Sequence, residues 1–146
     1  MKTFSAKPTD VTRKWYILDA SQVTLGRLAT FAASLLMGKG KPSFTKHIDV
    51  GDYVIVINTD KLKITGNKTD GKKYYSHSGY PGGLREITLG KQLKKDSTKI
   101  IEHAVRGMLP ANKLRPARLS RLNIYEGSEH NHDAQKPELL IIGGNK

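Results

Sequence analysis

The chain has 146 residues, 37% of them hydrophobic, which is enough for one modest core, so we expect a single main domain. Its 25 lysines and arginines outnumber 13 acids, and the net charge of +12 is typical of a protein that binds a polyanion. Nucleic acid is favoured over the alternatives, an anionic membrane surface or an acidic protein. The absence of cysteine excludes disulfides, thiolate zinc sites, iron–sulfur clusters and cysteine nucleophiles.

Nothing in the sequence predicts a membrane segment. The longest apolar runs, residues 53–57 and 139–142, are far shorter than the roughly 20 residues that cross a bilayer. Residues 1–15 contain no apolar run of signal-peptide length. We therefore expect no membrane partner and a cytoplasmic protein.

The first half of the chain predicts a βαβ unit. After a polar arm over residues 1–13, a strand is expected from Trp15 to Leu18, ending at Asp19. Apolar residues then recur at helical spacing from Thr24, a possible N-cap, until Gly38 and Gly40 suit a helix end. Residues 53–57 are apolar at every position, which is typical of a strand buried on both faces of a parallel sheet. The order strand, helix, strand predicts an α/β fold.

The second half has one clear helix, which opens at Asp96 or Ser97 and ends at Pro110. The remaining signals are weaker. In chain order they predict a short strand over 61–65, a turn at 66–68, an extended piece over 74–77, a loop over 78–83, and a helical turn followed by a strand within 119–125. The expected division is an arm (1–13), a single α/β domain (14–142) and a C-terminal tail (143–146).

A basic stretch without acids runs from His103 to Tyr125. A solvated face usually mixes both signs of charge, whereas arginine binds phosphate bidentately and stacks on bases. The pattern therefore favours a nucleic-acid surface, with the more exposed charge after the Pro110 break. Its cations are Arg106, Lys113, Arg115, Arg118 and Arg121, the last three spaced to share one face of a helix.

The segment from Gly38 to Lys41 resembles a phosphate loop only superficially. It lacks the GxxxxGK[ST] spacing and follows the C-terminus of a helix, whereas phosphate binds at helix N-termini. Two interpretations remain: glycines that end a helix beside solvated lysines, or a loop that approaches a nucleic-acid backbone through Lys39, Lys41 and Lys46.

Two further clusters leave alternatives open. Lys68, Lys72 and Lys73 precede two tyrosines and a histidine, which either stack on bases or are partly buried in the core. The pattern EHNHD at residues 129–133 has too few separated ligands for a metal site, so its histidines are either solvated or contact RNA phosphate. No catalytic or cofactor motif is present, and Asp19, Asp60 and Asn58 are the only candidate acid–base groups. Asp19 is better explained as a residue that ends a strand or caps a turn.

Several motifs, in order, resemble the bacterial large-ribosomal-subunit protein thirteen family. They are WYILDA at 15–20, LGRLA at 25–29, FTKH at 44–47, GDYVIVIN at 51–58, TGNK at 65–68, HAVRGMLP at 103–110, NKL at 112–114, YEGSEH at 125–130 and AQKP at 134–137. The resemblance covers roughly residues 14–138. It implies a three-layer α/β/α fold with a small, mostly parallel sheet, and a structural, non-catalytic role in the ribosome.

The resemblance also implies partners: large-subunit ribosomal RNA, bound early in assembly, and neighbouring ribosomal proteins, with messenger RNA as a further partner in some members. The chain departs from the family pattern at Arg115-Pro116, Lys46 and Asn131. Because proline fixes its own φ and biases its predecessor toward an extended conformation, any helix carrying the later arginines should begin at or after Pro116.

We therefore predict an RNA-binding ribosomal protein without a catalytic site, metal or cofactor. The alternatives are an RNA-processing or RNA-modifying enzyme, and a translational regulator that binds messenger RNA. The predicted RNA contacts are Arg27, Lys39, Lys41, Lys46, His47, Lys68, Lys72, Lys73, Arg106, Lys113, Arg115, Arg118, Arg121, His130 and His132. Among the arginines, Arg118 and Arg121 are expected to be better contacts than Arg115.

Overall fold

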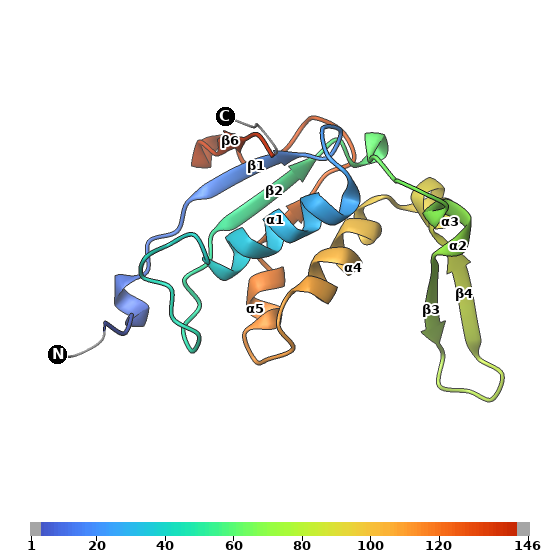
Figure 1. Ribbon diagram of the computed structural model, residues 1–146, viewed down its shortest axis with the longest axis horizontal. Helices are drawn as coiled ribbons and strands as arrows, with labels where there is room; N and C mark the ends of the chain where they lie inside the picture. Colours follow the sequence, from blue (N-terminus) through green and yellow to red (C-terminus); the bar gives the residue numbers. More distant parts are fainter. Residues whose placement is uncertain (1–3, 143–146) are drawn as a thin grey trace.

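The computed structural model describes residues 4–142, so the predicted tail and the first residues of the arm lie outside the described residues. Figure 1 shows the elements in chain order. The helices are α1 (Leu25–Met37), α2 (Lys68–Gly71), α3 (Leu89–Lys95), α4 (Thr98–Met108) and α5 (Arg115–Leu119), with 3-10 turns η1 (Pro8–Asp10), η2 (Thr59–Lys61) and η3 (Asp133–Gln135). The strands are β1 (Trp15–Asp19), β2 (Tyr53–Ile57), β3 (Lys73–His77), β4 (Leu84–Thr88), β5 (Leu122–Ile124) and β6 (Glu138–Leu140).

The main sheet has four strands in the order β5-β2-β1-β6, and each pairing is parallel. β1 and β2 pair from Trp15 opposite Tyr53 to Asp19 opposite Ile57. The middle residues of β2 are buried, as the continuous apolar run predicts for an inner strand. The predicted βαβ unit is therefore confirmed.

α1 begins and ends near the expected residues. Thr24 occupies the N-cap position, although its side chain makes no capping hydrogen bond. Gly38 ends the helix with a φ of 76°, and the backbone N–H groups of Gly38 and Lys39 donate to the carbonyls of Leu35 and Ser34. This left-handed conformation favours glycine because it has no Cβ.

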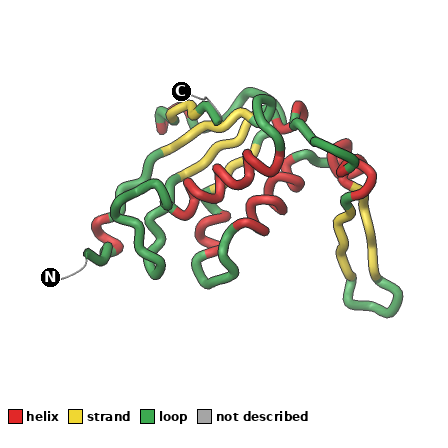
Figure 2. The backbone as a smooth tube through the Cα atoms, in the orientation of Figure 1, coloured by secondary structure: helices red, strands yellow, loops and turns green. Residues whose placement is uncertain are grey.

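The helices α1, α4 and α5 cover one face of the sheet (Figures 1 and 2). Leu18, Val54 and Val56 point to that side and join the buried residues of α1 and α4 in one core. On the other face, the Trp15 ring stacks on Tyr53 at 4.2 Å and lies 5.0 Å from the His132 ring, next to η3. These aromatic residues and η3 form a thin layer on the second face of the sheet, which completes the predicted three-layer α/β arrangement.

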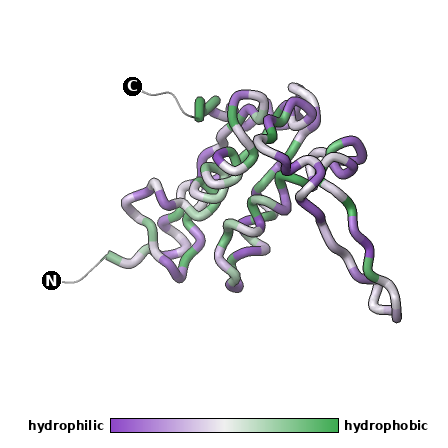
Figure 3. The backbone as a smooth tube through the Cα atoms, turned by 45° about the vertical axis from the view of Figure 1, so that its right-hand side comes forward, coloured by the Kyte–Doolittle hydropathy of each residue, from purple (hydrophilic) through white to green (hydrophobic). Residues whose placement is uncertain are grey.

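The polypeptide between β2 and α4 differs most from the expectation. Residues 61–65 form no strand beyond an isolated bridge of Lys63 to Thr24, and Lys61 is the last residue of η2. The extended piece near Tyr74 is β3, and it pairs with β4 in an antiparallel hairpin around the predicted loop. Figure 1 shows this hairpin projecting from the body, with α2 and α3 at its base, and Figure 3 shows hydrophilic residues along both arms.

The last two helices and β5 lie near the residues where the sequence predicts them, and their bounds differ by a few residues. α4 stops before Pro110, and α5 and β5 fall close to the predicted helical turn and strand. α5 begins at Arg115, one residue before the predicted limit, so that Pro116 lies in the first turn, where its missing N–H costs nothing. Within residues 4–142, no helix is both long and apolar enough to cross a membrane.

The described part of the N-terminal arm contacts the loop that follows α1. Ala6 is buried, the hydroxyl of Ser5 lies 3.3 Å from His47 Nε2, and Lys41 donates to the carbonyl of Thr12. The division into arm, domain and tail stays a prediction.

Candidate nucleic-acid interface

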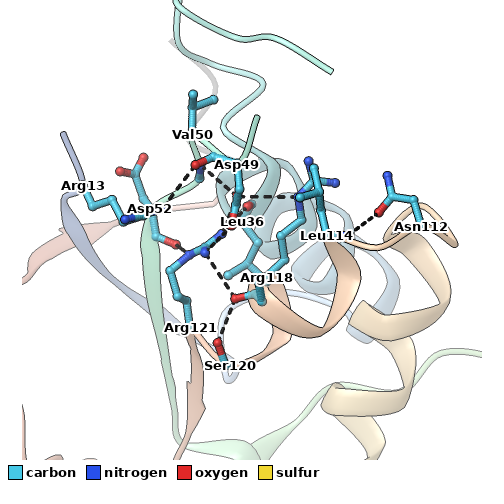
Figure 4. Close-up of polar contacts among 12 residues, drawn as sticks. Arg13, Leu36, Asp49, Val50, Asp52, Asn112, Leu114, Arg118, Ser120 and Arg121 are labelled. Atoms are coloured by element: carbon cyan, nitrogen blue, oxygen red, sulfur yellow. Dashed lines mark hydrogen bonds and ion pairs between the residues drawn. The ribbon is translucent and has the colours of Figure 1, made fainter. Parts of the chain in front are cut away.

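Arg121 points into the molecule rather than into solvent. Its guanidinium binds the Asp49 carboxylate through both terminal nitrogens, at 2.5 and 2.7 Å, and also donates to the carbonyls of Leu36 and Ala117 (Figure 4). The residue is only 6% exposed. This bidentate geometry is the strongest form of the arginine–carboxylate pair.

Arg118 shares the same carboxylate. Its Nε lies 3.7 Å from Asp49 Oδ1, beyond hydrogen-bond distance, and the residue is 2% exposed. The predicted exposure of Arg118 and Arg121 is therefore wrong. Arg118 lies in α5 and Arg121 follows this helix, and both side chains turn toward Asp49. Contact with RNA by these two arginines stays an untested prediction, and Arg121 in particular is committed to the protein interior.

Lys41 is also an internal cation. Its ammonium group donates to Asp52 Oδ1 at 2.6 Å and to the carbonyls of Thr12 and Val50. All of its hydrogens therefore have protein acceptors in this conformation. Contact of Lys41 with a nucleic-acid backbone stays an untested prediction.

The loop carrying Asp49 and Asp52 reaches the arginines through a close backbone approach. A Cβ at Gly51 would lie 1.8 Å from the carbonyl oxygen of Leu36, at the end of α1. Only glycine lets the loop pass at this distance, so Gly51 sets where Asp49 meets Arg121.

Arg115 has a different internal role. Its Nε and Nη2 donate to the carbonyls of Pro110 and Leu109, at 3.1 and 3.3 Å. These carbonyls follow the C-terminus of α4, where a cation is electrostatically favourable. The half-buried Arg115 therefore ties α5 to the end of α4.

The histidine pair is packed rather than solvated. His132 Nε2 lies 2.9 Å from the Tyr125 hydroxyl, and the N–H of His132 donates to His130 Nδ1. Both residues are half-buried. Within residues 4–142, no group of three or more His, Asp or Glu side chains could hold a metal ion.

Asp19 ends β1 and caps a turn, as expected. Burial raises its pKa, but hydrogen bonds from Ser21, Asn58 and Gln22 outweigh burial and hold the pKa below its ordinary value. At neutral pH Asp19 is therefore ionised and fully hydrogen-bonded, so it is poorly suited to act as a general acid or base.

Three predicted cations converge outside the core. Arg27 and Lys68 line one shallow hollow, and Lys68 and Lys72 line a second; Gly26 and Lys68 line both. All three side chains are exposed; Arg27 comes from α1, Lys68 from α2, and Lys72 from the residue between α2 and β3. We call Arg27, Lys68 and Lys72 the α1–α2 cationic surface; His103 of α4 lies beside it and was not among the predicted contacts.

The tyrosines of the hairpin lie in different environments. Tyr74 packs against the core, where burial raises its pKa, while Lys72 lies 5.4 Å over its ring. Tyr75 is 63% exposed and Tyr80, in the hairpin loop, is 75% exposed. Partial burial thus describes Tyr74, whereas stacking of the exposed Tyr75 on a base stays a prediction.

Lys73 is exposed on the hairpin and forms an ion pair with Glu86 at 3.1 Å. Its hydrogen bond to Glu86 raises the pKa of the ammonium group. Arg85, also exposed, was missed because β4 was not predicted.

The remaining predicted cations are exposed on two other regions. Lys39, Lys46 and His47 lie on the loop after α1, while Arg106 and Lys113 lie on α4 and on the turn that follows it. The basic side chains thus form several surfaces, in addition to the internal set.

The parallel sheet and the basic surfaces define a basic α/β protein. The family described as Ribosomal protein L13 matches residues 13–131. The chain belongs to this family, as its motifs predict.

The relatives are similar over their full lengths. Proteins named large ribosomal subunit protein uL13 are 56% identical in Syntrophomonas wolfei (99% of this chain, 100% of the relative) and 55% identical in Shewanella amazonensis (97% and 100%). A third, from Brevibacillus brevis, is 56% identical (97% and 98%). These are structural, non-enzymatic proteins, which confirms that expectation and argues against an RNA-processing enzyme. Messenger-RNA binding stays a prediction.

Proposed function

We propose that the protein binds large-subunit ribosomal RNA through its exposed cations and supports an early step of subunit assembly. The observation that carries the proposal is the convergence of Arg27, Lys68 and Lys72 on the α1–α2 cationic surface. Relatives named as large-subunit proteins support the choice of RNA.

Binding is mainly electrostatic in this proposal. Lysine and arginine side chains neutralise phosphates and release counterions, and they read the shape of the RNA rather than its base sequence. The exposed hairpin, with Tyr75, Tyr80 and Arg85, adds side chains that can stack on unpaired bases. The other exposed predicted contacts, Lys39, Lys46, His47, Lys73, Arg106 and Lys113, extend the binding surface.

The test is the affinity for a large-subunit RNA fragment as a function of salt. We expect log K to fall linearly with log salt. Replacement of Arg27, Lys68 and Lys72 by Gln should make the slope shallower by about 0.7–0.9 for each phosphate that is no longer neutralised. The matched control replaces Lys7, Lys61 and Lys136, which are exposed on separate parts of the chain, by Gln. A salt-independent affinity, or equal slopes for the two triple variants, would contradict the proposal.

Assembly has a separate measurement. Mass spectrometry of purified large subunits and their precursors should find the protein at one copy per particle, including in early precursors. Its absence from early precursors would leave RNA binding intact but contradict the assembly role.

A further inference from the structure

A hollow of about 340 Å³ lies beside the C-terminal end of α1, between the loop that follows this helix and the turn after α4. Its apolar wall includes Met37, Phe44 and Met108, and its cations are Lys39, Lys46 and Arg118. These cations differ from those of the α1–α2 cationic surface, although Met108 also lines the hollow that contains Lys68 and Lys72.

The interior of the hollow carries excess positive charge. Asp49 already gives both oxygens to Arg121, so Arg118 shares a carboxylate that another arginine has neutralised. Within residues 4–142, no group accepts a hydrogen bond from the buried Nε of Arg118. Figure 4 shows the ion pair between Arg118 and Asp49, and Arg118 also lines the hollow. A buried cation with an incomplete set of partners favours an anionic or hydrogen-bond-accepting ligand.

The rim supplies further charge and the wall supplies apolar surface. Lys39 and Lys46 are exposed, while Phe44 is half-buried and Met108 is 42% exposed. A phosphate ion alone would leave the wall uncovered, and an apolar protein side chain would leave the cations without partners. An unpaired nucleotide satisfies both, because its base has an apolar face and polar edges and its phosphate is anionic.

We propose that this hollow binds one unpaired nucleotide of RNA. The base packs against Met37, Phe44 and Met108, and its edge accepts hydrogen bonds from Arg118. The phosphate lies between Lys39 and Lys46 at the rim. This inference rests on the proposed RNA-binding function and assigns it a specific pocket.

The two methionines of the wall allow a direct test, because their methyl groups report an aromatic base by ring-current shifts in NMR spectra. Adenosine 5′-monophosphate and single-stranded hexaadenylate should shift the methyl signals of Met37 and Met108, whereas inorganic phosphate should not. Replacement of Lys39 and Lys46 by Gln should weaken nucleotide binding roughly tenfold but leave the weaker binding of adenosine unchanged. Phe44→Leu should weaken both roughly tenfold.

The control replaces Lys61 and Lys136 by Gln, which removes the same charge from exposed sites away from the hollow. Equal shifts with inorganic phosphate, or shifts with an apolar peptide but not with nucleotides, would overturn the proposal. The large-subunit RNA fragment could bind with the expected salt slope while nucleotides leave both methionine methyl signals unchanged. This result would overturn nucleotide binding in the hollow and leave the proposed function intact. Nucleotide shifts without salt-dependent binding of that fragment would instead overturn the proposed function.

Discussion

Arg106 and Arg121 lie at the two ends of one acid-free basic stretch, yet they have opposite environments. Arg106 is exposed on α4, whereas Arg121 is 6% exposed and bound to Asp49. The two residues have the same chemistry and similar neighbours in the sequence. What separates them is a carboxylate from a distant loop, so local charge patterns do not determine which arginine meets solvent.

The same contrast separates two groups of lysines. Lys41 is enclosed by Asp52 and backbone carbonyls, while Lys39, two positions before it, is exposed. The internal cations hold the loop after α1 against α5, and the exposed ones stay available to a ligand. Perturbing the two groups should therefore change different quantities.

The largest expected effect on stability comes from Arg121→Ala. Removing this side chain leaves the Asp49 carboxylate without its bidentate partner, which typically costs about 3–5 kcal/mol when an ion pair is buried. Urea denaturation should show this loss in the free energy of unfolding. Arg118→Met should cost less than about 2 kcal/mol, because Asp49 keeps Arg121 and the apolar replacement leaves no buried charge. Equal losses in the two variants would contradict this division of roles.

Gly51→Ala should have the next largest effect. The added Cβ would meet the Leu36 carbonyl oxygen at 1.8 Å, so the loop must move and carry Asp49 away from Arg121. We expect a loss of about 2–3 kcal/mol by the same measurement. Gly107→Ala is the control: open space surrounds that position in α4, and alanine should stabilise the helix by up to about 1 kcal/mol.

Asp96 should contribute less, and with a defined dependence on pH. The side-chain hydrogen bond from Thr98, with the backbone N–H groups of Lys99 and Thr98, lowers the pKa of Asp96. Because the folded pKa is depressed, this stabilisation is present above the unfolded value of about 3.9 and is lost as pH falls through the folded pKa. Asp96→Ala should cost about 1 kcal/mol at neutral pH.

The pH dependence of this variant is its internal check. The difference in unfolding free energy between wild type and Asp96→Ala should narrow in acid, below about pH 4. A difference that stays constant down to about pH 2 would show that the ionised carboxylate does not provide the stabilisation.

Arg106→Ala should have the smallest effect on stability, within about 0.5 kcal/mol, because the side chain is exposed and alanine favours a helix. Thermal unfolding of the Arg106→Ala and Arg121→Ala variants under the same conditions compares the stability contributions of these two arginines directly. A loss comparable with that of Arg121→Ala would remove the distinction between internal and exposed arginines.

The elements with strong local signals could be predicted from the sequence. β2 is continuously apolar, α1 has a helical apolar stripe, and Gly38 ends α1 in the conformation that glycine favours. The hairpin was only half predicted. Leu84 and Arg85 are exposed in β4, which has no buried face to produce a regular alternation, and the short helix α3 follows it directly.

The candidate site was predictable in its composition but not in its arrangement. The exposed Arg27, Lys68 and Lys72 were among the predicted contacts, but their convergence depends on the tertiary fold, which brings Lys68 and Lys72 to hollows also lined by α1. His103 and Arg85 had weak signals: His103 stands at the start of the basic stretch but is not one of its named cations, and Arg85 lies in the strand that was not predicted.

The sequence by itself determined the excess of positive charge, the βαβ unit and the motifs that indicate the family. These follow from composition and from patterns within short segments. Only the tertiary structure decided which cations are internal, because the carboxylates of Asp49 and Asp52 reach Arg121 and Lys41 across the fold. Gly51 makes that approach possible by letting the loop pass close to Leu36. A buried arginine and an exposed one look alike in sequence, and the difference lies in whether folding brings an acid to meet it.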